Sequence, residues 1–461
     1  MASSKPNILV FLTDDHGQWA LPTYGNSEIS APNIDYLAAN GAVMENGFTP
    51  CPVCSPARAS FFTGLLPSQH GVHDWLRESE QALTHDGIDN KTNVAELLQA
   101  DGYHTGLVGK WHCGRSSEPK RGFDRWFSYQ VAQYPHFGVQ NFSDQGEHIQ
   151  RKGHQSALLT DEASAFLRGR PKDRPFFLFV GYVNTHGPHR DQPERLVDHY
   201  RRNAAFVDIP KETFAECHGI RGRRVWPAEH VYREELAQYY ASVTMIDDQV
   251  GRLLDELDVQ NAMDDTLIVY TGDHGHMNGH HGMFNKGNGT VPQNFIEESI
   301  RIPYIAMWRN GFEAAQRRAE SVDLCDWLPT LMDAASLETP EEIHTPGRSF
   351  LPLLKGEAVE WRDAQFCEYG NARMIRTDEY KLIRRYPGPN GHFPDELYDL
   401  KNDPRERENR IDRAEYAEIA AQLTARLDAH FETYETDECS GRDIAARPRC
   451  NANEPWCRAV S

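Results

Sequence analysis

The sequence predicts an α/β protein: a large mixed, mostly parallel sheet sandwiched by helices, followed by a small C-terminal α+β domain. Three observations support this fold class. Short apolar runs alternate with helical patterns, most of these runs end in a polar cluster, and the pattern changes near residue 365. Continuous β-rich runs indicate strands buried on both faces, which is typical of parallel sheets. A chain of 461 residues is long enough for one large and one small domain.

Five apolar runs predict the strands of the large sheet. They cover residues 8–12, 105–108, 176–183, 267–270 and 302–308. Helices are expected at 92–99, where a cap residue precedes periodic apolar positions, and at 233–257, where the apolar residues share one stripe.

Charged or metal-binding side chains follow the first four runs. In chain order they are Asp14 and Asp15, Lys110 and His112, His186, and Asp273 and His274. Ligands bind at the carboxyl edge of open α/β sheets. We therefore expect four separate segments to converge on one active site.

The pattern after residue 365 indicates a second unit. Residues 373–385 alternate as a strand does, 396–400 form a second short strand, and 416–434 are helical. The expected division is a catalytic domain at 1–365, a small antiparallel-sheet-plus-helix domain at 366–435, and a polar tail at 436–461.

Composition excludes several function classes. The net charge of −20, from 68 acidic and 48 basic residues, would repel nucleic acid. No apolar run is long enough for a membrane helix. The polar start lacks the features of a signal peptide, so we expect a cytoplasmic protein. The nine cysteines form no zinc-type double CxxC set, and a Cys450–Cys457 bridge has little support in that compartment.

Cys54 lies in a segment that favours an anion site. Ser55, as the capping hydroxyl, followed by Pro56 in the first turn, predicts a helix start. Cys54 is therefore expected just before a helix N-terminus, where backbone N–H groups attract anions. Arg58 falls in the first turn and adds a planar fork of donors. The alternatives for the Cys51–Cys54 pair are a redox couple or half of a zinc site.

Two acidic pairs predict a metal site. Asp14 with Asp15, and Asp273 beside His274, end buried strands, where close carboxylates need a compensating cation. Three aspartates suit Ca²⁺, Mg²⁺ or Mn²⁺. A single such pair is more often a turn or a helix cap, but two pairs at equivalent strand ends favour a metal.

The nucleophile segment resembles a known family. Cys54-Ser55-Pro56-Ala57-Arg58, followed by Thr63-Gly64, is similar to the signature of the type I, formylglycine-dependent sulfatases of the alkaline phosphatase superfamily. The resemblance covers roughly residues 6–410 and implies an alkaline phosphatase-like fold. It also implies hydrolysis of a sulfate monoester of a carbohydrate, small alkyl or aryl group, with release of inorganic sulfate. A maturation enzyme would oxidise Cys54 to Cα-formylglycine, whose hydrate attacks sulfur.

The resemblance assigns a role to each candidate residue. The metal ligands are Asp14, Asp15, Cys54, Asp273 and His274; Arg58, Lys110 and Lys286 bind the sulfate; His112 orients the hydrate or accepts its proton; His186, with His189 as the alternative, protonates the leaving oxygen. These residues can stabilise charge on the ester in the transition state. A dense set of further histidines is expected to contribute to the substrate pocket, namely His16, His70, His73, His276, His280 and His281.

Five choices stay open. Many sulfatases have Asn where His274 stands, and the His form also occurs in phosphonate monoester hydrolases, so a phosphonate monoester or phosphodiester hydrolase is the alternative activity. Ca²⁺ is the first expectation for the metal, and the softer nitrogen ligand makes Mn²⁺ a competitor. A non-catalytic binder of sulfated ligands is a rival from another class. A homo-oligomer is possible, and the arginines of residues 190–232 form either a solvated surface or a wall facing an acidic sugar.

Overall fold

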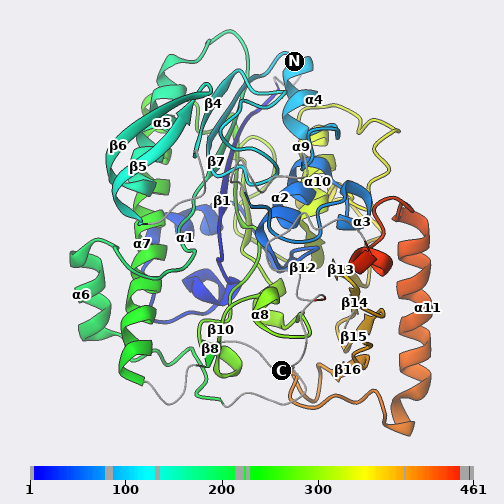
Figure 1. Cartoon of the computed structure of the whole chain (residues 1–461). Coiled ribbons are helices and arrows are strands. Elements are labelled where there is room, and N and C mark those ends of the chain that lie inside the picture. The colour runs from blue at the N-terminus through cyan, green and yellow to red at the C-terminus, as the bar shows by residue number, and fades with distance from the viewer. Residues whose placement is uncertain are drawn as a thin grey trace.

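A ten-stranded sheet forms the centre of the protein in the computed structural model (Figure 1). The structure describes residues 5–77, 87–129, 135–212, 223–224, 229–388, 391–446 and 456. The strand order is β12 (Gln316–Asp323), β2 (Ala42–Phe48), β11 (Tyr304–Met307), β9 (Thr266–Gly272), β1 (Asn7–Thr13), β7 (Phe176–Gly181), β3 (His104–Gly109), β4 (Arg125–Tyr129), β5 (Phe137–Asp144) and β6 (Glu147–His154).

Five central strands run parallel, and four of them come from the predicted apolar runs; the fifth run, 302–308, forms the antiparallel β11, and the parallel β4 was not predicted. β9, β1, β7, β3 and β4 pair in parallel, whereas β11 and β5 are antiparallel to their neighbours. The register aligns the carboxyl ends of the parallel strands, with Leu12 beside Gly181 and Gly181 beside Gly109. The residues that follow β1, β7, β3 and β9 therefore start from one edge of the sheet.

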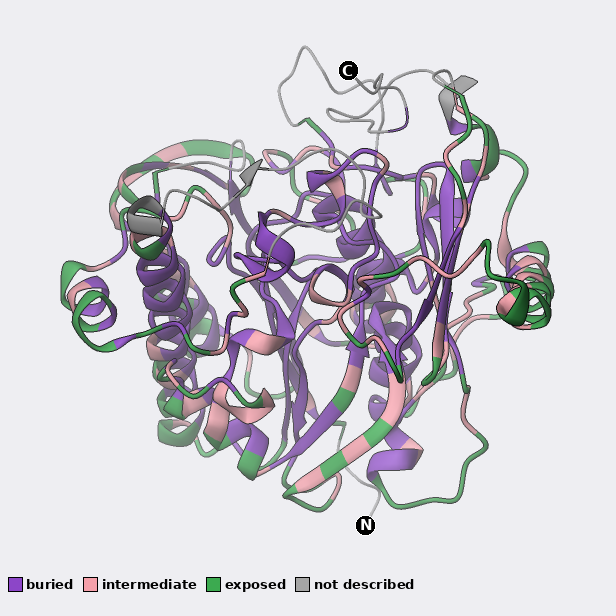
Figure 2. Cartoon of the chain, turned by 90° about the horizontal axis from the view of Figure 1, so that it is seen from below, coloured by how far each residue is buried: buried purple, intermediate pink, exposed green. Residues whose placement is uncertain are grey.

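Helices cover both faces of the sheet, which confirms the predicted sandwich. One face packs against α1 (Pro32–Ala39), α5 (Gln155–Gly169) and α7 (Glu229–Val259), and α6 (Glu194–Asn203) packs on α7. The other face packs against α2 (Cys54–Thr63), α4 (Val94–Ala100), α9 (Trp327–Ala334) and α10 (Leu351–Leu354). Alternate residues of each central strand enter the two hydrophobic cores on either side of the sheet. The central strands are therefore buried, as Figure 2 shows.

A four-stranded antiparallel sheet and one helix follow the large sheet. The strands are β13 (Gln365–Tyr369), β14 (Ala372–Arg376), β15 (Tyr380–Arg385) and β16 (Glu396–Asp399), and α11 (Ala417–Tyr434) packs on one face. The opposite face packs on Phe48, Cys51 and Val53, directly behind the start of α2. The C-terminal sheet thus supports the segment that carries Cys54.

The run 373–385 is two strands, not the single strand that we expected. Thr377 donates its N–H to the Tyr380 carbonyl oxygen at 2.8 Å, which closes a turn between β14 and β15. Each half alternates as a strand does, so the pattern alone did not mark the turn.

Short elements complete the described chain. They are α3 (Pro67–His70), α8 (Glu297–Ile300), and the two-stranded pair β8 (Arg223–Arg224) and β10 (Met283–Phe284). In the described part of the chain, every helix is too short or too polar to span a bilayer. Cys450 and Cys457 lie outside the described residues.

Candidate active site

Helix α2 presents Cys54 at its first turn. The helix begins at Cys54 itself, with Val53 as the N-cap residue, so the prediction that Ser55 caps the helix is wrong by two positions. The Ser55 hydroxyl instead accepts the N–H of Leu76 at 2.9 Å, which ties the following loop to the helix. Because the first backbone N–H groups of a helix have no helical partner, an anion beside Cys54 is favoured.

The four predicted strand ends meet around Cys54. The Cys54 sulfur lies 3.2 Å from Asp14 Oδ1, 3.2 Å from His274 Nε2 and 3.0 Å from Lys286 Nζ. Successive side chains of a strand point to opposite faces. Asp15 leaves the strand conformation with a left-handed φ of 57°, which allows Asp14 and Asp15 to face the same site.

The acidic cluster fits a divalent metal. Ligand atoms of Asp14, Asp15, Cys54 and His274 lie within 4.8 Å of one another, and all four residues are buried. His274 Nδ1 lies 2.9 Å from the Gly275 carbonyl oxygen and must donate to it, so Nε2, which lies 3.2 Å from Lys286 Nζ, is the nitrogen that a metal would bind. Asp273 adjoins this set, with Oδ1 at 3.5 Å from His274 Nε2.

Three cationic side chains surround the same point. Arg58 is fully buried and donates to Asp273 Oδ2 at 2.8 Å and to the Lys110 carbonyl oxygen at 2.9 Å. Lys110 pairs with Asp14, and Lys286 pairs with Asp15 at 2.5 Å. Each lysine therefore joins a carboxylate on one side and the nucleophile position on the other.

The positive charges of these side chains alter the ionisation of Cys54. Burial opposes ionisation, but Lys110 and Lys286 nevertheless hold the pKa of the Cys54 thiol well below its usual value. Burial alone raises the pKa of a thiol, as it does for Cys51. The two members of the CxxC pair are therefore chemically different, and both are free thiols in the structure.

Two histidines present a defined nitrogen to the site. His112 donates from Nε2 to the Leu76 carbonyl oxygen at 2.9 Å, so Nδ1 is its acceptor nitrogen. His186 donates from Nδ1 to the Gly187 carbonyl oxygen at 2.6 Å, so Nε2 faces Asp15, whose Oδ2 is 3.8 Å away. Burial opposes a charged His186, but Asp15 raises its pKa above the usual value.

The other histidines divide into two groups. Five have partners of their own: His16 with Tyr270, His70 with Ser60, His73 with the Cys439 carbonyl, His280 with the Met277 carbonyl and His281 with Glu298. His189 and His276 lie near the site, with ring centroids 5.4 Å apart and both packed beside Tyr239, although His276 Nδ1 also accepts the Asn278 N–H at 3.2 Å. These two are the better candidates for a pocket wall.

Two residues that the sequence motifs did not indicate hold the backbone of Asp14 and Asp15, which follow β1. The Thr185 hydroxyl lies 3.0 Å from the carbonyl oxygens of Asp14 and Asp15, and the Tyr239 hydroxyl donates to the Asp15 carbonyl at 3.1 Å. Tyr239 belongs to α7, far along the chain. No local pattern could have shown this contact.

The arginines between residues 190 and 202 are engaged in ion pairs. Arg190 pairs with Asp191, Arg202 with Asp198, and Arg201 with Glu194, Asp198 and Glu234. Arg221 lies outside the described residues, and Arg223 and Arg224 form β8. For the arginines of α6, these exposed pairs favour the solvated-surface interpretation.

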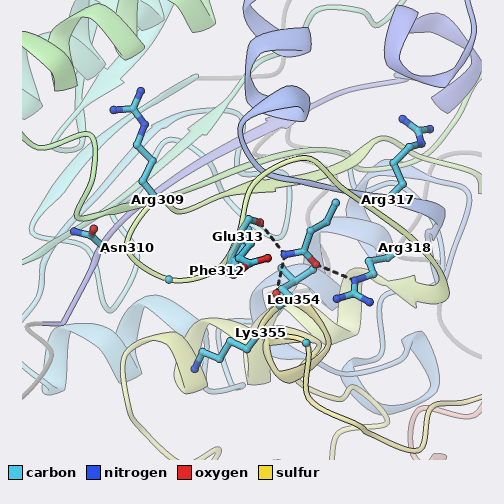
Figure 3. A pocket seen from close by; sticks show the side chains of 11 residues that line it. Arg309, Asn310, Phe312, Glu313, Arg317, Arg318, Leu354 and Lys355 are labelled. Atoms are coloured by element: carbon cyan, nitrogen blue, oxygen red, sulfur yellow. Dashed lines mark hydrogen bonds between the residues drawn. The ribbon is translucent and has the colours of Figure 1, made fainter.

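A separate hollow of about 660 Å³ lies at the start of β12 (Figure 3). Its arginines are occupied: Arg309 pairs with Asp264, Arg317 with Glu45, and Arg318 donates to Gln316. Its lining includes no Asp, Cys or His. The reactive groups are therefore those at the carboxyl edge of the parallel strands.

Comparisons with known proteins agree with this geometry. The chain is 28% identical to an N-acetylglucosamine-6-O-sulfatase of Bacteroides thetaiotaomicron, covering 95% of this chain and 88% of that one. A structure described as a complex with its substrate D-glucosamine-2-N,6-O-disulfate superimposes with a TM-score of 0.81 at 25% identity, covering 94% and 98%. A phosphonate monoester hydrolase of Agrobacterium radiobacter shares the fold, with a TM-score of 0.73 at 21% identity, covering 93% and 96%.

Fold and site together define a hydrolase of the alkaline phosphatase superfamily. The model of the Sulfatase family matches residues 6–337, and that of the N-sulphoglucosamine sulphohydrolase C-terminal region matches residues 279–433. The chain therefore belongs to the sulfatase family, and it is an enzyme that hydrolyses sulfate esters. Membership implies a metal ion and a formylglycine made from a cysteine, for which the buried Asp14, Asp15, Cys54 and His274 cluster is suited.

Proposed function

We propose that this sulfatase hydrolyses a sulfate monoester of a sulfated sugar, with residue 54 as the nucleophile. The observation that carries the proposal is the position of Cys54, which lies within hydrogen-bonding distance of Lys286 and of the metal-ligand atoms of Asp14 and His274. Formylglycine at position 54 would supply an aldehyde whose hydrated form attacks sulfur. A bound divalent cation would supply charge stabilisation to the nucleophile and the sulfuryl oxygens.

The other side chains of the site have three separate roles in the proposed reaction. Arg58, Lys110 and Lys286 bind and neutralise the sulfuryl oxygens as charge develops. His112 Nδ1 accepts a proton from the nucleophile, because its other nitrogen is fixed on Leu76. His186 Nε2 gives a proton to the ester oxygen as its bond to sulfur breaks.

A sulfated sugar is proposed as the substrate because most of the relatives named by their substrate, and the structure solved with its substrate, are sugar sulfatases, although a choline-sulfatase matches as much of the chain. The relative from Bacteroides thetaiotaomicron and the glucosamine disulfate complex each cover at least 94% of it. The test compares kcat/KM for N-acetylglucosamine 6-sulfate, choline sulfate and an aryl sulfate, with released sulfate measured directly. The highest value on the sugar ester supports the proposal, and a preference for choline sulfate would overturn it.

The metal is proposed to be Ca²⁺, because three carboxylates line the site. Mn²⁺ and Mg²⁺ are the alternatives, Mn²⁺ because of the nitrogen of His274. Metal analysis of the purified enzyme, followed by removal of the metal and reloading with each ion, distinguishes them. Full recovery of activity with Mn²⁺ but not with Ca²⁺ would contradict the assignment.

A second candidate activity is hydrolysis of a phosphonate monoester or phosphodiester. His274 at the ligand position is the observation that favours it. The same kinetic comparison, extended to an aryl phosphonate ester, decides between the two. We expect the sulfate ester to be the better substrate, and a reversed order would establish the second activity.

A further inference from the structure

A second histidine, His136, contacts the backbone of His186. His136 Nε2 lies 3.1 Å from the His186 carbonyl oxygen. Because a carbonyl oxygen can only accept, Nε2 carries the hydrogen. His136 is 1% exposed and the hydrogen bond is partly buried, so water competes with it less than at an exposed surface.

His136 is itself fixed at the junction of β5 and α5. Its carbonyl oxygen accepts the N–H of Gln155, the first residue of α5, at 2.8 Å. Gln140 of β5 donates to the Pro135 carbonyl oxygen at 2.9 Å and accepts from the Gln155 side chain at 3.3 Å. Burial lowers the pKa of His136 to about 4, so the ring stays neutral at ordinary pH.

The peptide around His186 is held from two other directions. The Thr185 N–H donates to the Asp14 carbonyl oxygen at 2.9 Å, and the His186 N–H donates to the Val183 carbonyl oxygen at 2.8 Å. These contacts secure the amino side of the peptide on the strand ends. His136 secures the carbonyl side, next to Gly187, whose own carbonyl orients the His186 ring.

We propose that His136 is a positioning residue for the leaving-group acid: by holding the His186 carbonyl, it fixes where His186 Nε2 meets the ester oxygen. The inference rests on the proposed role of His186. The proton passes from Nε2 to the ester oxygen while the S–O bond breaks and its electron pair stays on oxygen. A displaced acid slows this transfer, and the loss is greatest for leaving groups that are strongly basic.

The test uses two replacements and two aryl sulfates. His136→Phe fills the space without a donor, whereas His136→Gln places an amide N–H near the position of Nε2. His136→Phe should lose roughly tenfold in kcat/KM on phenyl sulfate and no more than about twofold on 4-nitrophenyl sulfate, whose leaving group needs little protonation. His136→Gln should recover most of the loss. His430→Phe, which removes a histidine of α11 in the C-terminal unit, is the matched control and should change neither value.

Equal losses of His136→Phe on both esters, or no loss at all, would overturn the inference. His186→Ala, measured in parallel, separates the two ideas. If His186→Ala loses the same factor in kcat/KM on both esters, the proposed acid role of His186 fails. If His186→Ala loses more kcat/KM on phenyl sulfate than on 4-nitrophenyl sulfate and His136→Phe does not, only the positioning role of His136 fails. Should His136→Phe not fold, His136→Asn, whose amide is too short to reach the carbonyl, carries the same expectation.

Discussion

Lys286→Met removes a charge beside the nucleophile while it keeps the length of the side chain. Lys286 Nζ lies 3.0 Å from Cys54 Sγ and 2.5 Å from Asp15 Oδ1. A donor at this distance from the reacting atoms contributes mainly to the transition state. Loss of one such donor costs about 10²–10³ in kcat, or about 3–4 kcal/mol. We expect this loss in the metal-loaded enzyme, assayed with 4-nitrophenyl sulfate, with a smaller change in KM.

Lys381→Met is the matched control, because Lys381 is a second buried lysine with no part in the chemistry. Its Nζ lies 2.7 Å from Glu297 Oε1, 2.7 Å from Glu406 Oε1 and 2.8 Å from the Phe295 carbonyl oxygen. Its removal takes the lysine partner from the buried Glu406, whereas Glu297 keeps Arg301 and Arg376; breaking such a buried pair costs about 3–5 kcal/mol in stability. The control should unfold at a lower temperature yet keep its kcat per folded molecule. A Lys286→Met enzyme within tenfold of wild type, or a Lys381→Met enzyme with the same kinetic loss, would refute the reasoning.

Three further predictions concern stability. Burial and the nearby Arg362 lower the pKa of His430 to about 3, below its unfolded value of about 6.5. The stability that this shift provides is complete above the unfolded pKa and is lost as the pH falls, by about 2 kcal/mol at about pH 5. Denaturant titrations at two pH values should therefore show that His430→Phe loses less stability at acid pH than the wild type does. Equal losses for the two proteins would contradict this. A divalent cation at about 100 times its Kd should stabilise the chelator-treated enzyme by about 2.7 kcal/mol. Asp14→Asn should lose most of that increment in thermal scans, and a full increment would argue against this site. Trp456 is 3% exposed, and its ring packs edge-on against that of Tyr369 with the centroids 5.7 Å apart. Trp456→Ala should cost about 3–5 kcal/mol, and an unchanged unfolding temperature would show that this contact does not stabilise the fold.

The sequence predicted the features that depend on local pattern. The apolar runs before Asp14, Lys110, His186 and Asp273 are central strands, and the structure brings these residues to one edge. Parallel strands share a carboxyl edge, so a run of β-rich residues followed by a polar cluster is sufficient for this prediction.

The features that were missed depend on contacts between distant segments or on exposed surface. β5 and β6 escaped notice because each has an exposed face with polar residues, as at Gln150 and Lys152 of β6, and these interrupt the apolar pattern. The contact of His136 with His186 joins two elements fifty residues apart. Ser55 was expected to cap α2, but its hydroxyl is used by the loop at Leu76. In each case the deciding partner lies elsewhere in the fold.

The central claim is that residue 54 acts as formylglycine and not as cysteine. Mass spectrometry of the peptide spanning Cys54, taken from enzyme made in its native host, tests this most directly. The account predicts that the CH₂SH group is replaced by an aldehyde, in a fraction that rises in proportion to specific activity among preparations. Fully active enzyme that carries an unmodified thiol at Cys54 would contradict it.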